Sequence, residues 1–222
     1  MCKGPSFVCD LRKGWIIVLV LAAFISVAGY SQHQGYRPIG DLPAFKKQFA
    51  AESSKISSIE SSFTQEKVLT ALTEKITSTG KFWFKRSNKV RIEYIKPYTY
   101  TMIMNGDKML FRDDQKENKV NVRSNKLFQQ INQIMIDCVQ GTILDSKDFT
   151  TKVFEDDNVF LLEMTPVSKA LREFFQTIVL KVDKHDYSVK SIEMNEPAGD
   201  KTIISFKNKK VNEQLADTVF AL

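Results

Sequence analysis

The sequence has few of the residues that carry out catalysis or bind metal ions. It holds only two histidines and three cysteines in 222 residues. His33 lies in a polar stretch and His185 in a polar turn, so neither is placed as a general base or a metal ligand. Glycine-rich phosphate loops and nucleophile-elbow motifs are absent. We therefore expect a protein that is not an enzyme and that holds no cofactor and no metal.

Cysteine is also too scarce for an internal disulfide after export. Cys2 and Cys9 precede the apolar run Trp15–Gly29, and only Cys138 follows it. Cys9 lies on the wrong side of that run to be a lipid-modified cysteine. A lone cysteine in the apolar stripe of a helix, which is where Cys138 falls, is most often a small core residue.

The N-terminal residues have the pattern of an export signal. Basic residues precede the uncharged run WIIVLVLAAFISVAG, whose 15 residues are fewer than the roughly 20 that a membrane span needs. Small residues at its end suit cleavage near Tyr30. We predict a signal peptide over residues 1–29 and a soluble, exported protein. An uncleaved membrane anchor is the alternative.

Charge gives no indication of a nucleic-acid partner. The formal net charge of +6 is modest for this length, and the lysines are scattered among acids. Because no basic block is present, we expect no binding to nucleic acid.

Two helices are predicted by apolar spacing. After a flexible lead-in over residues 30–40, Asp41 is placed to cap a helix that runs to about Ser58. A second helix, residues 125–140, ends at Gly141. A short helical segment follows at residues 168–173. The apolar stripe of the first helix comprises Leu42, Phe45, Phe49, Ile56 and Ile59.

Most of the remaining chain alternates with the period of two that is typical of strands. Tight turns join successive runs, and one of them is expected at Asn105-Gly106. Sequential hairpins imply an antiparallel sheet with one apolar face, which the helices can cover. We predict a single α+β domain over residues 41–222 with about ten strands. The runs are residues 61–69, 74–85, 89–94, 98–104, 108–113, 119–123, 149–155, 159–165, 175–183, 187–196 and 201–208.

The hairpin GKFWFKRSNKVRIEY raises a question about Arg86. Strand alternation places Phe82 and Phe84 on one face, and Arg86 falls at the end of that same apolar face. From the spacing alone, the simpler interpretation is that Arg86 reaches solvent past the end of its strand. Its forked donors could instead bind carbonyl groups of a covering helix.

The order of several motifs resembles the family of periplasmic outer-membrane lipoprotein carriers, LolA. An amphipathic helix is followed by a Phe-x-Gln strand at Phe63, the strand Gly80–Arg86, a strand into Tyr-x-x-Pro at Tyr94–Pro97, and the Asn-Gly hairpin. The resemblance implies an open antiparallel half-barrel whose concave apolar cavity is covered by helices. It also implies a monomeric periplasmic carrier of acylated lipoproteins, with an inner-membrane ABC-type release complex and an outer-membrane acceptor as partners.

The resemblance also implies roles for particular residues. Arg86 would latch the lid shut in the empty form. The family commonly has proline after this arginine, and this chain has Ser87. The aromatic stripe and the second helix equally suit an ordinary filled core, because spacing does not distinguish the two. The acyl chains would contact Phe63, Phe82, Phe84, Val90, Ile92, Tyr94, Met102 and Met104, and the lid helix would present Leu127, Phe128, Ile131, Ile134 and Met135.

Other functions fit the same expected fold. A half-barrel of this kind could be a sensor or adaptor that binds a lipoprotein or an envelope regulator without transport. It could also carry another acylated lipid product. An exported enzyme acting on lipids is the third alternative, and it lacks a recognisable catalytic set.

Overall fold

The computed structural model describes residues 33–72, 74–113, 115–121, 133, 134, 136–138 and 140–222. The chain divides into two units, residues 1–36 and 37–222. In the first unit the described residues 33–36 form a turn, in which the Tyr36 amide donates to the His33 carbonyl at 3.1 Å. The predicted signal peptide lies outside the described residues.

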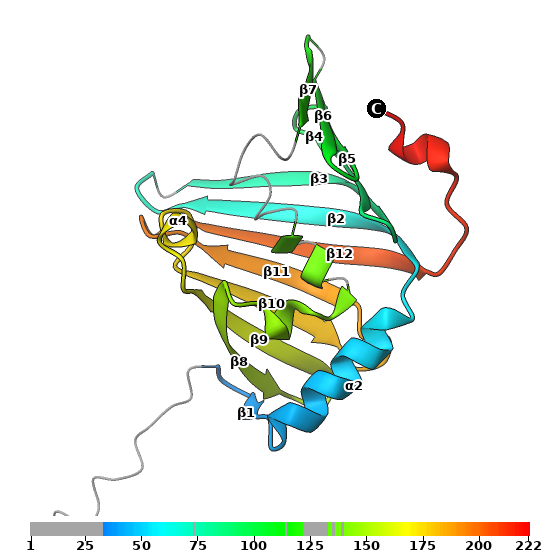
Figure 1. Ribbon diagram of the computed structural model, residues 1–222. Coiled ribbons are helices and arrows are strands. Elements are labelled where there is room, and N and C mark those ends of the chain that lie inside the picture. The colour runs from blue at the N-terminus through cyan, green and yellow to red at the C-terminus, as the bar shows by residue number, and fades with distance from the viewer. Residues whose placement is uncertain (1–32, 73, 114, 122–132, 135, 139) are drawn as a thin grey trace, which may run out of the picture. The chain divides into compact units, whose positions relative to one another are not determined.

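The second unit is built on one antiparallel sheet of twelve strands (Figure 1). The strand order is β1-β8-β9-β10-β11-β12-β2-β3-β4-β5-β6-β7, and in the described part of the chain β1 and β7 form two open edges. The predicted open antiparallel sheet is therefore confirmed, with twelve strands in place of about ten. The strands are β1 (Arg37–Pro38), β2 (Ser58–Leu69), β3 (Glu74–Lys85), β4 (Lys89–Lys96), β5 (Tyr100–Asn105), β6 (Lys108–Asp113), β7 (Glu117–Asn121), β8 (Phe149–Glu155), β9 (Val159–Pro166), β10 (Thr177–Asp183), β11 (Val189–Asn195) and β12 (Lys201–Val211).

Two local differences from expectation have simple causes. Strand β1 lies in the segment expected to be a flexible lead-in, and it pairs with the end of β8. The hairpin after β5 turns at Gly106 and Asp107, because Asn105 still pairs with Lys108. Gly106 has a φ of 59°, a conformation that glycine adopts without steric cost.

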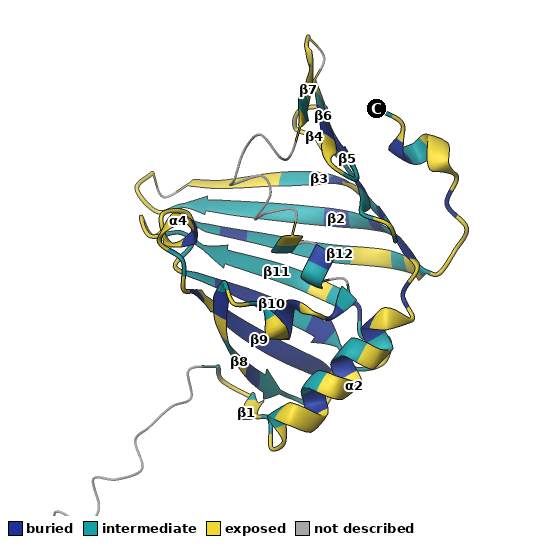
Figure 2. Ribbon diagram, in the orientation of Figure 1, coloured by how far each residue is buried: buried dark blue, intermediate teal, exposed yellow. Residues whose placement is uncertain are grey.

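Helix α2 (Leu42–Ser54) begins as predicted and ends earlier than predicted. The Asp41 carboxylate accepts a hydrogen bond from the Ala44 amide at 2.9 Å, which caps the helix. Its buried residues Phe45, Phe49 and Ser53 recur every four positions, so one face of the helix packs on the sheet (Figure 2). The Phe45 ring lies 4.6 Å from the ring of Phe160 in β9.

The second predicted helix, residues 125–140, lies largely outside the described residues, as do Leu127, Phe128, Ile131 and Met135. The described residues 133, 134, 136–138 and 140 are helical. Gly141 follows with a φ of 74°, as expected of a helix C-terminal glycine. A Cβ at Gly141 would lie 2.6 Å from that of Ser53, so this turn packs closely against α2.

The remaining helical elements are short. They are η2 (Ile143–Asp145), α4 (Lys169–Arg172) and η3 (Asp217–Phe220). Helix α4 was predicted over residues 168–173, and its cap Ser168 accepts from the Leu171 amide. Among the described residues, no helix has the length and apolar character to cross a membrane.

The sheet buries side chains on both faces. On the inner face, the one covered by α2, a first core cluster includes Phe45, Phe160 and Leu180. A second inner-face cluster is centred on strands β2–β6 and comprises Ile56, Ile59, Phe84, Val90, Met104 and Met109. On the outer face, the C-terminal segment packs Leu215 and Phe220 against Ile103 and Leu110.

Candidate functional site

A cavity of about 210 Å³ lies on the inner face of the sheet. Its walls come from strands β2, β3, β4, β10, β11 and β12, together with Ile134 and Cys138 of the helical segment. Nearly all the lining side chains are apolar, and few polar groups interrupt them. The lining comprises Ile56, Ile59, Ser61, Phe63, Phe82, Val90, Ile92, Tyr94, Ile134, Cys138, Phe175, Ile178, Leu180, Tyr187, Ser188, Val189, Ile192, Met194, Ile204, Phe206 and Lys209.

The structure brings together five of the eight side chains that we expected to contact acyl chains. Strand register explains why they meet, since Phe82 pairs with Ile92 across β3 and β4. From the predicted lid helix, Ile134 also reaches the cavity. The five lining side chains are Phe63, Phe82, Val90, Ile92 and Tyr94.

The other three expected contacts do not line the cavity. Phe84 is 1% exposed and Met104 is fully buried, and both belong to the second inner-face cluster. Met102 packs against the same cluster. This cluster borders the cavity, since its members Ile59 and Val90 line it, but Phe84, Met102 and Met104 are not among the lining residues.

The sequence interpretation missed the half of the cavity that the later strands supply. Strands β10, β11 and β12 contribute alternate residues to the inner face, as their period of two permits. The sequence of these strands has the same period of two, but the motifs that resemble the family all lie earlier in the chain. The missed residues include Ile178, Leu180, Ile192, Met194, Ile204 and Phe206.

Tyr94 is held in the cavity wall by ring packing and by a hydrogen bond. Its ring meets the Phe63 ring edge-on at 5.1 Å, and its hydroxyl donates to the Gln65 side-chain oxygen at 2.8 Å. Burial, followed by the neighbouring Tyr100, raises the pKa of Tyr94 above its usual value. The hydroxyl therefore remains protonated and keeps its donor role at neutral pH.

Arg86 binds the C-terminal end of α2. Its Nε donates to the Ile56 carbonyl at 2.7 Å, and one terminal nitrogen donates to the carbonyls of Ser53 at 3.0 Å and Ser54 at 2.6 Å. The last carbonyls of a helix have no partner within the helix, and the guanidinium satisfies them here. Arg86 is therefore in contact with a covering helix, the alternative that spacing alone disfavoured.

The residue after Arg86 cannot be proline in this backbone conformation. Ser87 has a φ of 74° and Asn88 a φ of 61°. Proline is restricted to a φ near −65°, so it would not fit this turn. The difference from the family pattern at Ser87 thus follows from a left-handed turn between β3 and β4.

Cys138 behaves as a wall residue of the cavity. It is buried, and that burial raises the pKa of its thiol to about 12. A protonated thiol is a poor nucleophile and a poor metal ligand. Within the described ranges, no cluster of histidine, cysteine and acidic residues has the arrangement of a metal site. The apolar lining of the cavity suits an apolar ligand.

Comparisons with known proteins agree with this geometry. The family model for the outer membrane lipoprotein carrier protein LolA matches residues 54–222. An outer-membrane lipoprotein carrier protein of Methylibium petroleiphilum is 27% identical over 208 residues, which cover 92% of this chain and 91% of that protein. The matched range of the family model contains every cavity-lining residue.

Solved structures with a similar chain path are more distant in sequence. A LolA superfamily protein from Nitrosomonas europaea is 9% identical, with a TM-score of 0.42 over 80% of this chain and 97% of its own. A chain in the MucA/MucB complex of Pseudomonas aeruginosa is 12% identical, with a TM-score of 0.48 over 80% of this chain and 60% of its own.

Proposed function

Because this chain belongs to the LolA family of outer membrane lipoprotein carriers, we propose that it binds the acyl chains of lipoproteins in the inner-face cavity and carries them across the periplasm. The observation that carries the proposal is the cavity itself, with its apolar walls on an open sheet. Export through cleavage near residue 29 would deliver the chain to that compartment. An inner-membrane ABC-type complex would load it, and an acceptor at the outer membrane would unload it.

The size of the cavity suggests that the structure is a closed form. An engineered cavity of about 150 Å³ accommodates benzene, and the present one measures about 210 Å³. It therefore has room for part of one acyl chain and not for several. Full loading requires the covering elements, α2 and the helical segment that carries Ile134, to move away from the sheet.

A closed empty form would let the carrier release its cargo. Each methylene removed from water contributes about 0.8 kcal/mol, so a buried acyl chain binds strongly. Contacts that the cover makes only when the cavity is closed compete with the cargo and offset part of that energy. Arg86 makes such contacts with the end of α2, and we assign it the role of latch.

A loading assay tests the proposal. Inner-membrane vesicles with the ABC-type complex, ATP and the purified protein should yield soluble lipoproteins bound to the protein, which mass spectrometry identifies by their acyl groups. Recovery of a free lipid, or of a regulator protein without acyl chains, would contradict lipoprotein transport.

A matched pair of variants in β4 connects loading to the cavity. Ile92→Glu places a carboxylate among apolar walls and should abolish loading, whereas Ile95→Glu changes a side chain that is 45% exposed and should not. Ile92→Ala keeps the wall apolar and should weaken loading without unfolding the protein. Equal loading by Ile92→Glu and Ile95→Glu would place the acyl chains elsewhere.

A further inference from the structure

Strand β12 contains a β-bulge that turns a lysine toward the cavity. Lys207 pairs with Ser62 and Lys210 with Glu60, so the two residues Asn208 and Lys209 lie opposite Ser61 alone. Asn208 adopts a φ of 53°, which accommodates the extra residue. Bulges of this kind redirect the side chains that follow them.

The change of direction is visible in the residues on either side of the bulge. Before it, Ile204 and Phe206 line the cavity and Lys207 is exposed. After it, Lys209 lines the cavity and Val211 packs against the second inner-face cluster. With regular alternation Lys209 would lie on the outer face with Lys207, and the bulge places it on the inner face instead.

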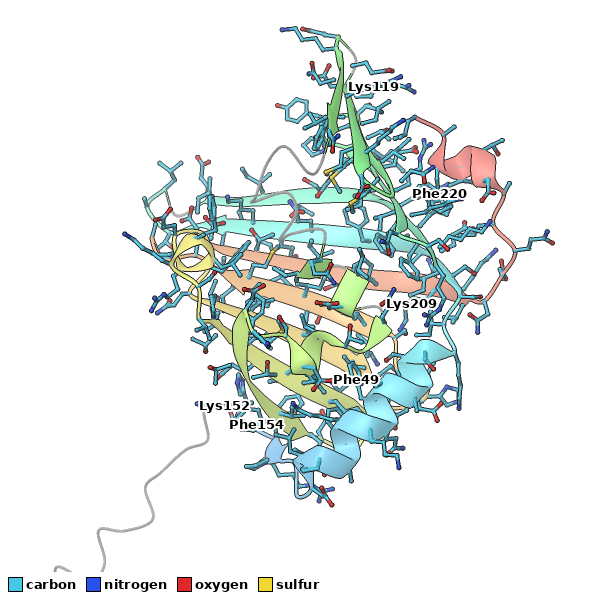
Figure 3. All side chains as sticks on the ribbon, in the orientation of Figure 1. Phe49, Lys119, Lys152, Phe154, Lys209 and Phe220 are labelled. Atoms are coloured by element: carbon cyan, nitrogen blue, oxygen red, sulfur yellow. The ribbon has the colours of Figure 1, made fainter. Side chains whose placement is uncertain are left out.

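Lys209 forms a polar corner with neighbouring groups in an otherwise apolar wall. Its side chain is 15% exposed, and its ammonium donates to the Ser188 hydroxyl and lies 3.7 Å from the Asp186 carboxylate. Ser188 in turn donates to Asp186. Lys209 and Phe49 of α2 are labelled in Figure 3. The Phe49 ring lies 6.3 Å from the ring of Tyr187, which lines the cavity together with Lys209.

Ser61 adds a second polar group to this corner. It lies opposite the bulge on β2, lines the same cavity and is 2% exposed. Its hydroxyl has no hydrogen-bond partner in the part of the chain that the structure describes. A buried hydroxyl without a partner is costly, and a ligand atom that pairs with it would remove that cost.

The charges at the corner select the kind of ligand atom. The Asp186 carboxylate already accompanies Lys209, so the corner offers no excess positive charge to a second carboxylate. The negative charge of Asp186 would repel a ligand carboxylate placed at this corner. A neutral carbonyl oxygen accepts hydrogen bonds from an ammonium and a hydroxyl without such repulsion. Ester-linked acyl chains carry this oxygen beside their first methylene, and free fatty acids carry a carboxylate there.

We infer that Lys209 and Ser61 form a subsite for the carbonyl oxygen of an ester-linked acyl chain, and that the cavity prefers such chains to free fatty acids. This inference rests on the proposed function, because it names the acyl linkage that the cavity takes. The apolar walls hold the hydrocarbon tail, and the subsite fixes where its ester group lies.

Displacement of the neutral dye N-phenyl-1-naphthylamine from the full chain tests the subsite. Three competitors share a twelve-carbon chain: methyl laurate, laurate, and dodecyl methyl ether, which lacks the carbonyl oxygen. Wild-type protein should bind methyl laurate about tenfold more tightly than the ether, as expected for one charge-assisted hydrogen bond. Laurate should bind more weakly than methyl laurate at neutral pH.

Variants assign the preference to the corner. Lys209→Met replaces the ammonium with an unbranched apolar side chain one atom shorter, and it should remove the tenfold preference for the ester over the ether. Ser61→Ala should reduce that preference. Lys207→Met changes the exposed lysine before the bulge and should retain it. If the ether binds as tightly as the ester, or if Lys209→Met keeps the preference, the subsite is disproved while the cavity stands. If no competitor displaces the dye from wild type, the proposed function fails as well.

Discussion

The ring of Phe63 lies directly over Gly80, its partner across strands β2 and β3. A Cβ added at Gly80 would lie 2.6 Å from the Phe63 ring and 2.1 Å from the Glu93 carbonyl oxygen. The absence of a side chain therefore lets the Phe63 ring occupy the wall of the cavity beside Tyr94. The cavity wall therefore needs glycine at position 80, because any larger side chain would displace the Phe63 ring.

Gly80→Ala should destabilise the protein and weaken binding. The added methyl group forces Phe63 and the backbone of β4 apart, a form of overpacking that costs roughly 1–3 kcal/mol. Chemical denaturation measures the free energy of unfolding. The affinity for N-phenyl-1-naphthylamine reports whether the cavity wall is still intact. Gly40→Ala is the control, because a Cβ there meets nothing within 4 Å. Equal unfolding free energies for the two variants would contradict the packing argument.

The faces of the hairpin were predictable because they depend only on local geometry. A period of two puts Phe82, Phe84 and Arg86 on one side whatever surrounds them. Which of them lines a cavity depends on distant segments. Phe84 is buried in the second inner-face cluster with Ile56 and Met109, whereas Phe82 lines the cavity, and no local pattern distinguishes these two phenylalanines.

The end of α2 and the bulge in β12 could not be predicted for the same reason. Ile56 and Ile59 continue the helical spacing, so the pattern extended the helix to about Ser58. The structure ends it at Ser54, where Arg86 binds the free carbonyls from 32 positions away. In β12, regular alternation from Phe206 would place Lys209 on the outer face, and only the pairing with β2 reveals the extra residue.

Cys138 should react slowly with iodoacetamide at pH 8. Because its pKa is raised to about 12, its thiolate fraction should be about a thousandfold lower than that of a thiol with the usual pKa near 8.5. Mass spectrometry of the peptide that contains Cys138 gives the labelling rate, and the same peptide in unfolded protein is the control. A native rate within about tenfold of the unfolded rate would show that the thiol is accessible.

Asp217 should make the stability of the C-terminal segment depend on pH. Its side chain accepts from Lys85 at 2.7 Å and Lys89 at 3.0 Å, and these contacts lower its pKa to about 2. Since the pKa is lower in the folded chain, the stabilisation is complete above about pH 4, the unfolded value. It is lost as the pH falls toward 2.

The variant Asp217→Asn tests this dependence. It should melt at a lower temperature than wild type at pH 7, and the difference should shrink as the pH falls from 4 to 2. Thermal melts across this range provide the measurement. Asp157→Asn removes a carboxylate from the exposed β8–β9 turn and serves as a comparison. A difference between wild type and Asp217→Asn that stays constant from pH 7 to pH 2 would show that the carboxylate does not hold the segment.

Arg86→Leu should leave loading intact and impair release. The empty closed form loses hydrogen bonds from a charged group to the end of α2, at about 1.5–3 kcal/mol, while an open loaded form loses nothing. The equilibrium between the closed and open forms then shifts roughly ten- to a hundredfold toward the open form. The variant should hold lipoproteins more tightly and transfer them poorly to acceptor membranes, and Arg86→Lys should show a partial effect because an ammonium lacks the fork.

The control for Arg86 has to come from the same strand and leave the cover untouched. Lys85 is unsuitable, because its ammonium donates to the Leu215 carbonyl at 2.8 Å and so holds the C-terminal segment. Lys81 is exposed on β3, and Lys81→Leu should load and transfer like wild type. Labelling of Cys138 adds a readout that does not depend on cargo, since a weaker latch should expose the thiol more often. Two results together would contradict the latch: Arg86→Leu transfers lipoproteins as well as Lys81→Leu does, and its Cys138 is labelled no faster than in wild type. Arg86 would then only cap α2, and opening of the cover would not depend on it.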